Sequence, residues 1–455
     1  MQAGAELRAL AGHLAGARYG DLPADALRAA RRSLVDTLGV AMAARGAAGM
    51  DAVAAACGDG GAAGGATVWA TGCRTSAAFA AFANSAHAGA LDFDSLHAGG
   101  AVHADLIVVP TVLAVAEREN LDGKSILRAI ALGDDLLCRL ALCTRENRGW
   151  FYTSLYGGIA SAAVAALLRG ADADGIANAM GLAYLSAGGT QQPASERSPA
   201  KRIQGAMSIL TGMAAADLAL AGLQGPRDIL QGKFGLFAMY EPGRTDALLA
   251  GLGQRFEGER IGYKAYPICQ CSHAAVDGLL RLRAGHGLEP GGVEEIAIRI
   301  SPYMDRLVGA PFAPGATPQI DAQFSLQYCA ARALLSGRLG IAEIGDAAVR
   351  DTRALALARR VRIVVDETNA GKYAPAGLTL RLSDGRILDA TATGYPGSEE
   401  QPLDDGLLDA KFRDCLAFAG AAPDRAESLL ASLRQAGRYD ARTLLAGIAA
   451  CRARG

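Results

Sequence analysis

Three residues in the segment KAYPICQCSHAAVDGLLRL could do chemistry at close spacing, namely Cys269, Cys271 and His273. All three residue types bind metals, and histidine is also the acid–base group whose ordinary pKa lies nearest neutrality. The segment could therefore be a metal site, a catalytic histidine beside two cysteines, or part of a core. Zinc usually needs four ligands and an iron–sulfur cluster needs three or four well-spaced cysteines. We find no second Cys/His pair in the sequence, so we expect no metal site.

His273 precedes an amphipathic run, AAVDGLLRL, and is expected at the start of a helix. The positive end of the helix dipole would favour the neutral imidazole there, and the ring could face a cleft. We interpret His273 as a catalytic or substrate-facing residue, with a structural histidine as the alternative. Cys269 and Cys271 are expected to be small buried hydrophobic residues.

A second cluster lies in HAGALDFDSLHAGGAVH, which holds three of the six histidines of the chain. His87, His97 and His103 share this short stretch with Asp92 and Asp94. An Asp-x-Asp pair with histidines in a Gly-rich loop suits either metal binding or acid–base catalysis. The alternative is a polar loop whose aspartates cap the next helix.

The composition excludes several functional classes. The chain has 455 residues with a formal net charge of −1, so it lacks the basic excess typical of partners of nucleic acid or anionic membranes. No run approaches the roughly 18 apolar residues of a membrane span, and the N-terminus does not resemble a secretion signal. Nine scattered cysteines suggest no disulfide framework, so we expect a reduced, cytoplasmic protein.

The hydrophobic pattern changes along the chain. Residues from about 5 to 250 have mostly helical periodicity, as in DALRAARRSLVDTLGVAMAA, without strands alternating between helices. After Lys264 come alternating segments, VEEIAIRISPY and RRVRIVVDE, a hairpin pattern in GLTLRLSDGRILDATAT, and a helix candidate in DAQFSLQYCAARALLSGRLG. Helical patterns return from PLDDGLLDAKFRDC onward. We predict a mainly α protein with a helical domain over 1–264 and 398–455 and an α+β domain over 265–397.

Several linked segments resemble the MmgE/PrpD family. They are HAGALDFDSLHAGGAVHADLIVVPTVLAVAE, SPAKRIQGAMSILTGMAAADLALAGLQGP, YKAYPICQCSHAAVDGLLRL, DAQFSLQYCAARALLSG and PLDDGLLDAKFRDC. They follow the family order from about residue 20 to 440, which makes the resemblance specific although each segment alone is weak. The resemblance implies a large all-helical domain from both chain ends with a smaller inserted α+β lid, and an active site between them.

The resemblance also implies a type of chemistry. The family includes 2-methylcitrate dehydratase, cis-aconitate decarboxylase and iminodisuccinate epimerase. Its members are typically homodimers that act on small di- or tricarboxylates without a metal or organic cofactor. We therefore expect a small-molecule carboxylate substrate, no cofactor, no nucleic-acid or membrane partner, and a homodimer.

The resemblance assigns roles residue by residue. Lys201 matches the family lysine and could pair with a substrate carboxylate or act as a base, and Tyr328 could donate a proton. Their alternatives are a solvated lysine and a half-buried helix tyrosine. The catalytic candidates are therefore His103, Lys201, His273, Asp92, Tyr328 and Tyr152, and the substrate-binding candidates are Asp94, His97, Arg202, Gln204 and Lys264.

Two departures from the family pattern affect the expected reaction. Members with dehydratase or decarboxylase activity often carry a histidine where this chain has Phe151, and another where it has Gln204. Tyr152 is the candidate to replace the first, although an ordinary tyrosine pKa of about 10 needs strong lowering for work as a base. Our first hypothesis is a lyase that removes a proton next to a carboxylate, and a hydro-lyase is the favoured type. The alternatives are an epimerase or isomerase, which the two departures favour, and a non-catalytic family member.

Overall fold

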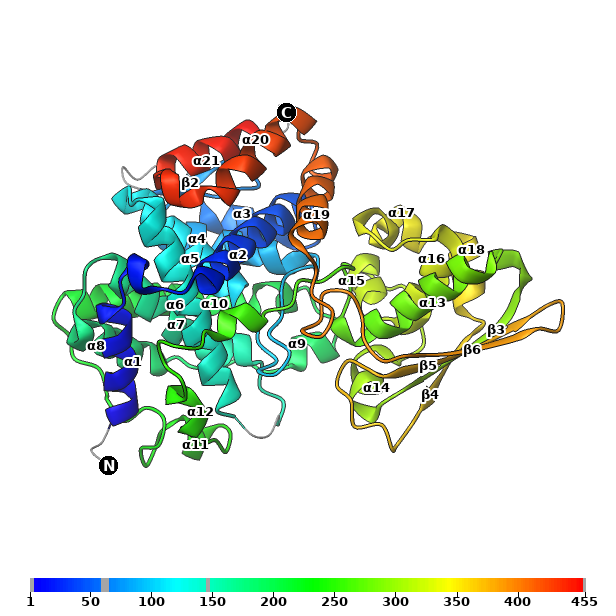
Figure 1. Ribbon diagram of the computed structural model, residues 1–455, viewed down its shortest axis with the longest axis horizontal. Helices are drawn as coiled ribbons and strands as arrows, with labels where there is room; N and C mark the ends of the chain where they lie inside the picture. Colours follow the sequence, from blue (N-terminus) through cyan, green and yellow to red (C-terminus); the bar gives the residue numbers. More distant parts are fainter. Residues whose placement is uncertain (1–3, 59–64, 145–147, 453–455) are drawn as a thin grey trace.

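The computed structural model describes residues 4–58, 65–144 and 148–452. The described chain is mainly α-helical with small sheets, which confirms the predicted class. Figure 1 shows two groups of elements side by side, a larger helical group and a smaller group that contains a four-stranded sheet. The GDGGAAGG segment near residue 60 lies largely outside the described residues.

The helical group is built from both ends of the chain. Its C-terminal helices pack on α2 and α5, so they lie beside elements that are hundreds of residues away in sequence (Figure 1). Its helices are α1 (Ala5–Gly16), α2 (Ala24–Ala43), α3 (Met50–Cys57), α4 (Ala77–Ala90), α5 (Asp105–Glu119), α6 (Gly123–Leu142), α7 (Tyr152–Leu168), α8 (Ala173–Tyr184), α9 (Gln192–Ser195), α10 (Ala200–Leu220), α11 (Leu236–Met239), α12 (Asp246–Leu249), α19 (Asp405–Phe418), α20 (Pro423–Arg434) and α21 (Ala441–Ala450).

The centre of this group is α7, which is buried around nearly its whole circumference and packs against α5, α6, α8 and α10. Small residues allow this. A Cβ added to Gly212 would lie 2.5 Å from the carbonyl oxygen of Gly158, so the α7 and α10 backbones can approach this closely only because position 212 is glycine. Helix α10 is long and apolar enough to cross a membrane by length and composition alone. Its packing on α4, α7 and α8 is typical of a core helix in a globular protein.

The smaller group has a sheet in the order β4-β3-β5-β6, with β3 and β4 parallel and the other pairs antiparallel. The expected hairpin is present, with Gly385 at positive φ between its strands. Helices α13, α16 and α18 lie on one side of the sheet (Figure 1). The strands are β3 (Val293–Ile300), β4 (Val361–Val365), β5 (Ala376–Leu382) and β6 (Ile387–Ala392), and the helices are α13 (His273–His286), α14 (Pro302–Val308), α15 (Pro318–Gln323), α16 (Leu326–Ser336), α17 (Asp346–Val349) and α18 (Thr352–Ala358).

One local expectation differs from the structure. The predicted single helix in DAQFSLQYCAARALLSGRLG is interrupted, because Ser325 accepts a hydrogen bond from the backbone of Tyr328 and caps a new helix. A short strand, β1 (Ala66–Thr67), pairs with β2 (Arg74–Thr75) beside the helical group. The division into domains over 1–264 with 398–455 and over 265–397 stays a prediction. Buried apolar side chains of residues 7–263 and 403–451 form one cluster, which also includes Ile341, and those of residues 268–395 form two further clusters.

Candidate active site

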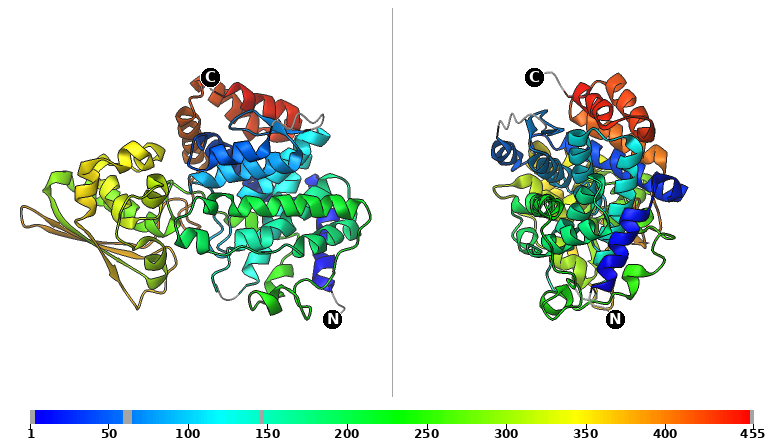
Figure 2. Two further views of the ribbon diagram at one scale, coloured as in Figure 1. Left: turned by 180° about the vertical axis from the view of Figure 1, so that it is seen from behind. Right: turned by 90° about the vertical axis from the view of Figure 1, so that its left-hand side faces the viewer.

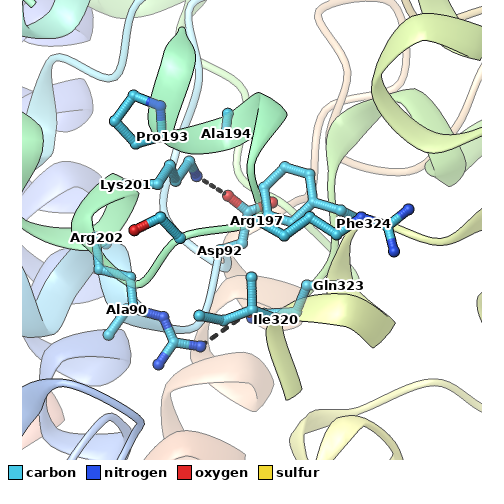
Figure 3. Close-up of a pocket in the computed structure, with 12 residues that line it drawn as sticks. Ala90, Asp92, Pro193, Ala194, Arg197, Lys201, Arg202, Ile320, Gln323 and Phe324 are labelled. Carbon is cyan, nitrogen blue, oxygen red and sulfur yellow. Dashed lines mark hydrogen bonds and ion pairs between the residues drawn. The ribbon is translucent and has the colours of Figure 1, made fainter. Parts of the chain in front are cut away.

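A cavity of about 100 Å³ lies between the two groups of elements. Its wall combines residues from loops and helix ends of the helical group with residues around α14 and the start of α13 in the smaller group. A narrower hollow adjoins it, shares Asp92, Ala194, Lys201 and Phe324, and is drawn in Figure 3. The polar and aromatic residues of the larger cavity are Asp92, His103, Phe151, Gln191, Lys201, Lys264, Cys269, Gln270, Cys271, Tyr303, Phe324 and Tyr373.

The loop that follows α4 carries the two aspartates of the predicted cluster. Asp92 has a φ of 49°, a left-handed conformation that aspartate tolerates better than most residues and that often occurs at functional sites. Two buried lysines hold the loop backbone. Lys264 donates to the carbonyl oxygen of Asp92 at 2.8 Å, and Lys411 donates to that of Phe93 at 2.7 Å. The direction of the Asp92 and Asp94 carboxylates is therefore set by residues from distant parts of the chain.

Two lysine ammonium groups and two carboxylates form a buried charge network. Lys201 pairs with Asp92 Oδ1 (Figure 3), while Lys264 Nζ lies 3.3 Å from Asp92 Oδ2 and 3.7 Å from Asp94 Oδ1. Burial alone would raise the pKa of Asp92, but Lys201 and Lys264 outweigh it and hold that pKa well below its usual value. Burial opposes ionisation of Lys264 in the same way, but Asp92 and Asp94 raise its pKa. The network is therefore charged at neutral pH.

His103 is oriented so that one ring nitrogen can accept a proton. Its Nδ1 lies 2.7 Å from Asp94 Oδ2 and 2.8 Å from the carbonyl oxygen of Ser95, both of which accept a hydrogen bond. Burial alone would raise the pKa of Asp94, but His103 and Lys264 lower it to about 2, so Asp94 stays ionised. These acceptors place the imidazole proton on Nδ1. Nε2 has no hydrogen-bond partner among the described residues and carries the lone pair of a candidate base.

Phe151 lies on the cavity wall with its ring centroid 6.1 Å from that of His103. The position where related sequences often carry histidine thus faces the cavity but supplies no ionisable group. Tyr152, the next residue, begins α7 and packs its ring 6.0 Å from that of Tyr156. Tyr152 is not among the residues that line the cavity.

In the segment KAYPICQCSHAAVDGLLRL, the two cysteines line the cavity and His273 lies in the core. Cys269 and Cys271 are buried as expected, but both line the cavity, so the expectation that they are only core residues is incomplete. His273 begins α13 as predicted, yet its ring is fully buried between Tyr266 and Tyr395 at centroid distances of 5.3 and 5.5 Å. Burial, followed by the charge of Lys264, lowers the pKa of His273 to about 3. Its ring is a neutral part of the core and does not line the cavity.

Tyr328 is also away from the cavity. Its hydroxyl donates to the carbonyl oxygen of Glu343 at 2.6 Å, and the side chain is fully buried among apolar residues. Burial raises the pKa of the Tyr328 hydroxyl. The structure therefore does not bring this hydroxyl to a position from which it could protonate a molecule in the cavity.

Two substrate-binding candidates, His97 and Gln204, have structural contacts away from the cavity. His97 is buried, accepts a hydrogen bond at Nδ1 from the Gly100 backbone and lies 3.6 Å from Glu257. Gln204 donates its side-chain amide to the carbonyl oxygen of Thr190. Neither lines the cavity.

Arg202 lines the narrow hollow together with Gln323, to which its guanidinium donates (Figure 3). Its guanidinium donates to the carbonyl oxygen of Ala48 at 2.7 Å and to the side chains of Gln319 and Gln323 at 2.9 and 3.1 Å. Burial lowers the pKa of Arg202 to about 10. These contacts connect α10 to α15 across the boundary between the two groups.

Sequence reasoning missed several residues of the site. Tyr303 and Tyr373 come from the smaller group and have rings 6.2 Å apart, while Gln270 lies between the two cysteines. Tyr303 follows the predicted strand VEEIAIRI and Gln270 lies inside the quoted segment, so their neighbourhood was visible in the sequence. Nothing in the pattern indicated that Lys411, on a C-terminal helix, would contact the Phe93 backbone.

The arrangement can remove and return a proton. His103 supplies a candidate base, and Lys201 and Lys264 supply cations that can hold a carboxylate and the negative charge that develops beside it. Within the described ranges, no three His, Cys, Asp or Glu side chains lie where they could hold a metal ion. The three residues of the CQCSH run do not converge, because the Cys271 thiol donates to the carbonyl oxygen of Lys372 while His273 packs in the core.

Comparison with known proteins identifies the family of the chain. The family model named MmgE/PrpD N-terminal domain matches residues 8–248, and the family model named MmgE/PrpD C-terminal domain matches residues 266–435. The chain belongs to the MmgE/PrpD family, as its sequence motifs indicated.

Individual relatives are distant. Human cis-aconitate decarboxylase is 25% identical over 353 residues, which cover 74% of this chain and 72% of the human protein. The 2-methylcitrate dehydratase of Cupriavidus necator is 28% identical over 343 residues, covering 70% and 69% of the two chains. A cis-aconitate decarboxylase of Aspergillus terreus is 26% identical over 221 residues, 45% of each chain.

Proposed function

We propose that this protein is a cofactor-independent lyase, by preference a hydro-lyase, that acts on a small di- or tricarboxylate by removing a proton next to a carboxylate. The observation that carries the proposal is the His103 site, where Asp94 and Ser95 hold Nδ1 and leave Nε2 facing a cavity beside two lysines. The family relationship to a decarboxylase and a dehydratase of small carboxylic acids supports the same class of reaction.

In the proposed mechanism, His103 Nε2 takes the proton from the carbon next to a substrate carboxylate. Lys201 and Lys264 bind that carboxylate and stabilise the negative charge that moves onto its oxygens. The imidazolium of His103 then gives this proton to the hydroxyl group on the neighbouring carbon, which leaves as water while the alkene forms. Asp94 stabilises the imidazolium that forms on His103 because its carboxylate accepts from Nδ1.

An epimerase or isomerase of a small dicarboxylate is the second candidate, and Phe151 favours it. A second group that protonates the leaving group would favour elimination, and at this position the wall offers an apolar ring. An epimerase needs only removal of the proton and its return to the other face. A non-catalytic family member is the third candidate, and the ionised network around Asp92 and Lys264 argues against it.

The experiment that separates these reactions is incubation with candidate acids in deuterated water. The set should contain citrate-like hydroxy acids, unsaturated tricarboxylates and amino-dicarboxylates, with products followed by NMR and mass spectrometry. We expect loss of water or carbon dioxide and formation of an alkene or a smaller acid. Solvent deuterium in an otherwise intact substrate would indicate the epimerase, and measurable binding without exchange or turnover would favour the non-catalytic protein.

The proposal includes a cytoplasmic homodimer. All nine cysteines are free thiols, which suits a reducing compartment. One side of α10 exposes a stripe that includes Met207, Thr211, Ala214 and Leu218, and the left view of Figure 2 shows this helix in green across that face of the protein. Met207 and Leu218 are 49% and 48% exposed, which is unusual for large apolar side chains on one face of a helix and suits an interface with a second copy.

A further inference from the structure

Two thiols line the same cavity as the lysine and histidine residues of the site. Cys269 and Cys271 both line the cavity, with Gln270 between them. The backbone N–H of Cys269 donates a hydrogen bond to the carbonyl oxygen of Gln323 at 3.0 Å, which fixes the backbone at this position. Cys269 also caps the short 3-10 helix Gln270–Ser272. The sulfur positions are therefore set by backbone contacts within the smaller group.

The two thiols differ in what they can donate and accept. Cys271 is fully buried and donates through Sγ to the carbonyl oxygen of Lys372 at 3.4 Å, whereas Cys269 is 8% exposed. The pKa of Cys269 lies below its usual value, first because of the neighbouring Cys271 side chain and also because of the positive charge of Lys264. Cys269 is therefore the thiol of the pair that has more access to the cavity and whose sulfur is not already donating to a carbonyl oxygen.

Other cysteines lack this combination of features. Burial raises the pKa of Cys57, Cys138, Cys143, Cys329, Cys415 and Cys451. Cys73 is partly exposed beside the β1–β2 pair, away from the cavity, and its thiol faces backbone carbonyl oxygens of Gly58 and Arg74. Cys73 therefore serves as an internal control, because it is an accessible thiol that does not share the cavity with Lys201 and Lys264.

We propose that Cys269 is a covalent modification site inside the cavity, and that it takes small electrophiles that carry a carboxylate next to an activated alkene. Lys201 and Lys264 lie on the same cavity wall and attract the carboxylate, which raises the local concentration of the electrophile beside the sulfur. The adduct fills part of a cavity of only about 100 Å³ and so excludes other molecules from it.

The chemistry of the step is a conjugate addition. The Cys269 thiolate forms an S–C bond to the β-carbon of the alkene, the π electrons move to the α-carbon and its carbonyl oxygen, and water delivers a proton to the α-carbon. The thiol proton has gone to solvent beforehand, so the adduct has the summed mass of protein and electrophile. The step needs no oxidant or reductant.

The test compares a charged and a neutral maleimide of similar size. The folded protein is treated with 3-maleimidopropionate or N-ethylmaleimide at limiting concentration, and the modified cysteines are mapped with time by peptide mass spectrometry. We expect Cys269 to react at least about tenfold faster than Cys271, because Cys271 is fully buried and its thiol donates to the carbonyl oxygen of Lys372. We also expect the charged probe to be favoured over the neutral one at Cys269 but not at Cys73.

Matched variants make the result specific. Cys269→Ser should remove the fast adduct and leave modification of Cys73 unchanged, while Cys73→Ser should leave the fast adduct in place. Lys201→Gln should reduce the preference for the charged probe at Cys269.

Complete modification of Cys73 while Cys269 stays unmodified would overturn the proposal, as would equal preference for the two probes at both cysteines. Labelling is measured without turnover, so it stands or fails independently of the proposed reaction.

Discussion

The Nζ atom of Lys411 lies 2.7 Å from the carbonyl oxygen of Phe93 and 2.7 Å from Oδ1 of Asp36. It also lies 4.0 Å from the centroid of the Phe93 ring. A lysine on a C-terminal helix thus holds the peptide unit between Asp92 and Asp94, on which the charge network and the orientation of His103 depend. Lys411 does not touch the cavity, so its expected role is to position the loop.

Replacement of Lys411 by Met should lower kcat more than it raises KM. Small displacements of catalytic groups can cost about 10²-fold in rate, and we expect a decrease of at least about tenfold. The substitution also leaves Asp36 unpaired, and breaking a buried pair typically costs about 3–5 kcal/mol of stability. Steady-state kinetics and thermal unfolding would measure both effects.

A double variant separates the two effects. Lys411→Met combined with Asp36→Leu removes both buried charges and should recover much of the stability, while the Phe93 carbonyl still lacks its donor. Turnover should therefore stay low in the double variant. If turnover returned together with stability, Lys411 would have only a structural role.

His103→Gln and His273→Gln should have opposite effects. Loss of His103 removes the candidate base, so turnover should fall by about 10²-fold or more with little change in unfolding temperature. Loss of His273 disturbs a fully buried ring between Tyr266 and Tyr395, so stability should fall while the folded protein keeps most of its turnover. The reverse pattern would show that the acid–base group is His273.

Asp105→Asn should alter the pH dependence of stability. Asp105 begins α5, is fully buried, and lies within hydrogen-bonding reach of Asp134; burial raises the pKa of Asp105 to about 7. In the unfolded chain the group ionises near its ordinary pKa, so between about pH 4 and 7 the native state binds one proton more. Stability should therefore fall as pH rises through this range.

Thermal unfolding from pH 4 to 9 would test this linkage. The asparagine variant lacks the titrating group and should show a smaller loss of stability over the same range. Asp122→Asn is a suitable control, because Asp122 is an exposed cap on α6 and should leave the pH profile unchanged. An unchanged profile in Asp105→Asn would mean that Asp105 is ionised throughout.

Leu218→Glu should weaken the proposed homodimer. The side chain is half exposed on the apolar stripe of α10, where a charge would be buried at an interface without a partner. Sedimentation velocity at several protein concentrations should show a dimer for the natural sequence and a shift toward monomer for the variant. Leu407→Glu, at an exposed position on α19, is the matched control. A monomer for both proteins would exclude this interface.

The sequence by itself determined the local structure and the family. Hydrophobic periodicity, the hairpin around Ser383–Gly385 and the helix that starts at His273 all depend on neighbours within a few residues. The rare loop with two aspartates and several histidines indicated Asp92, Asp94 and His103, and the family resemblance added Lys201 and Lys264; the structure brings these five residues together. The loop inference needed residue types and short spacings alone.

Only the tertiary structure decided which side chains share the cavity. His273 and Cys269 are four residues apart, yet one ring packs between tyrosines and the other side chain faces the lysines. Lys411 reaches Phe93 across 318 residues because α19 packs on α2. Side-chain direction depends on which distant elements pack together and on the cost of burying polar groups without partners, and spacing along the chain carries no record of either.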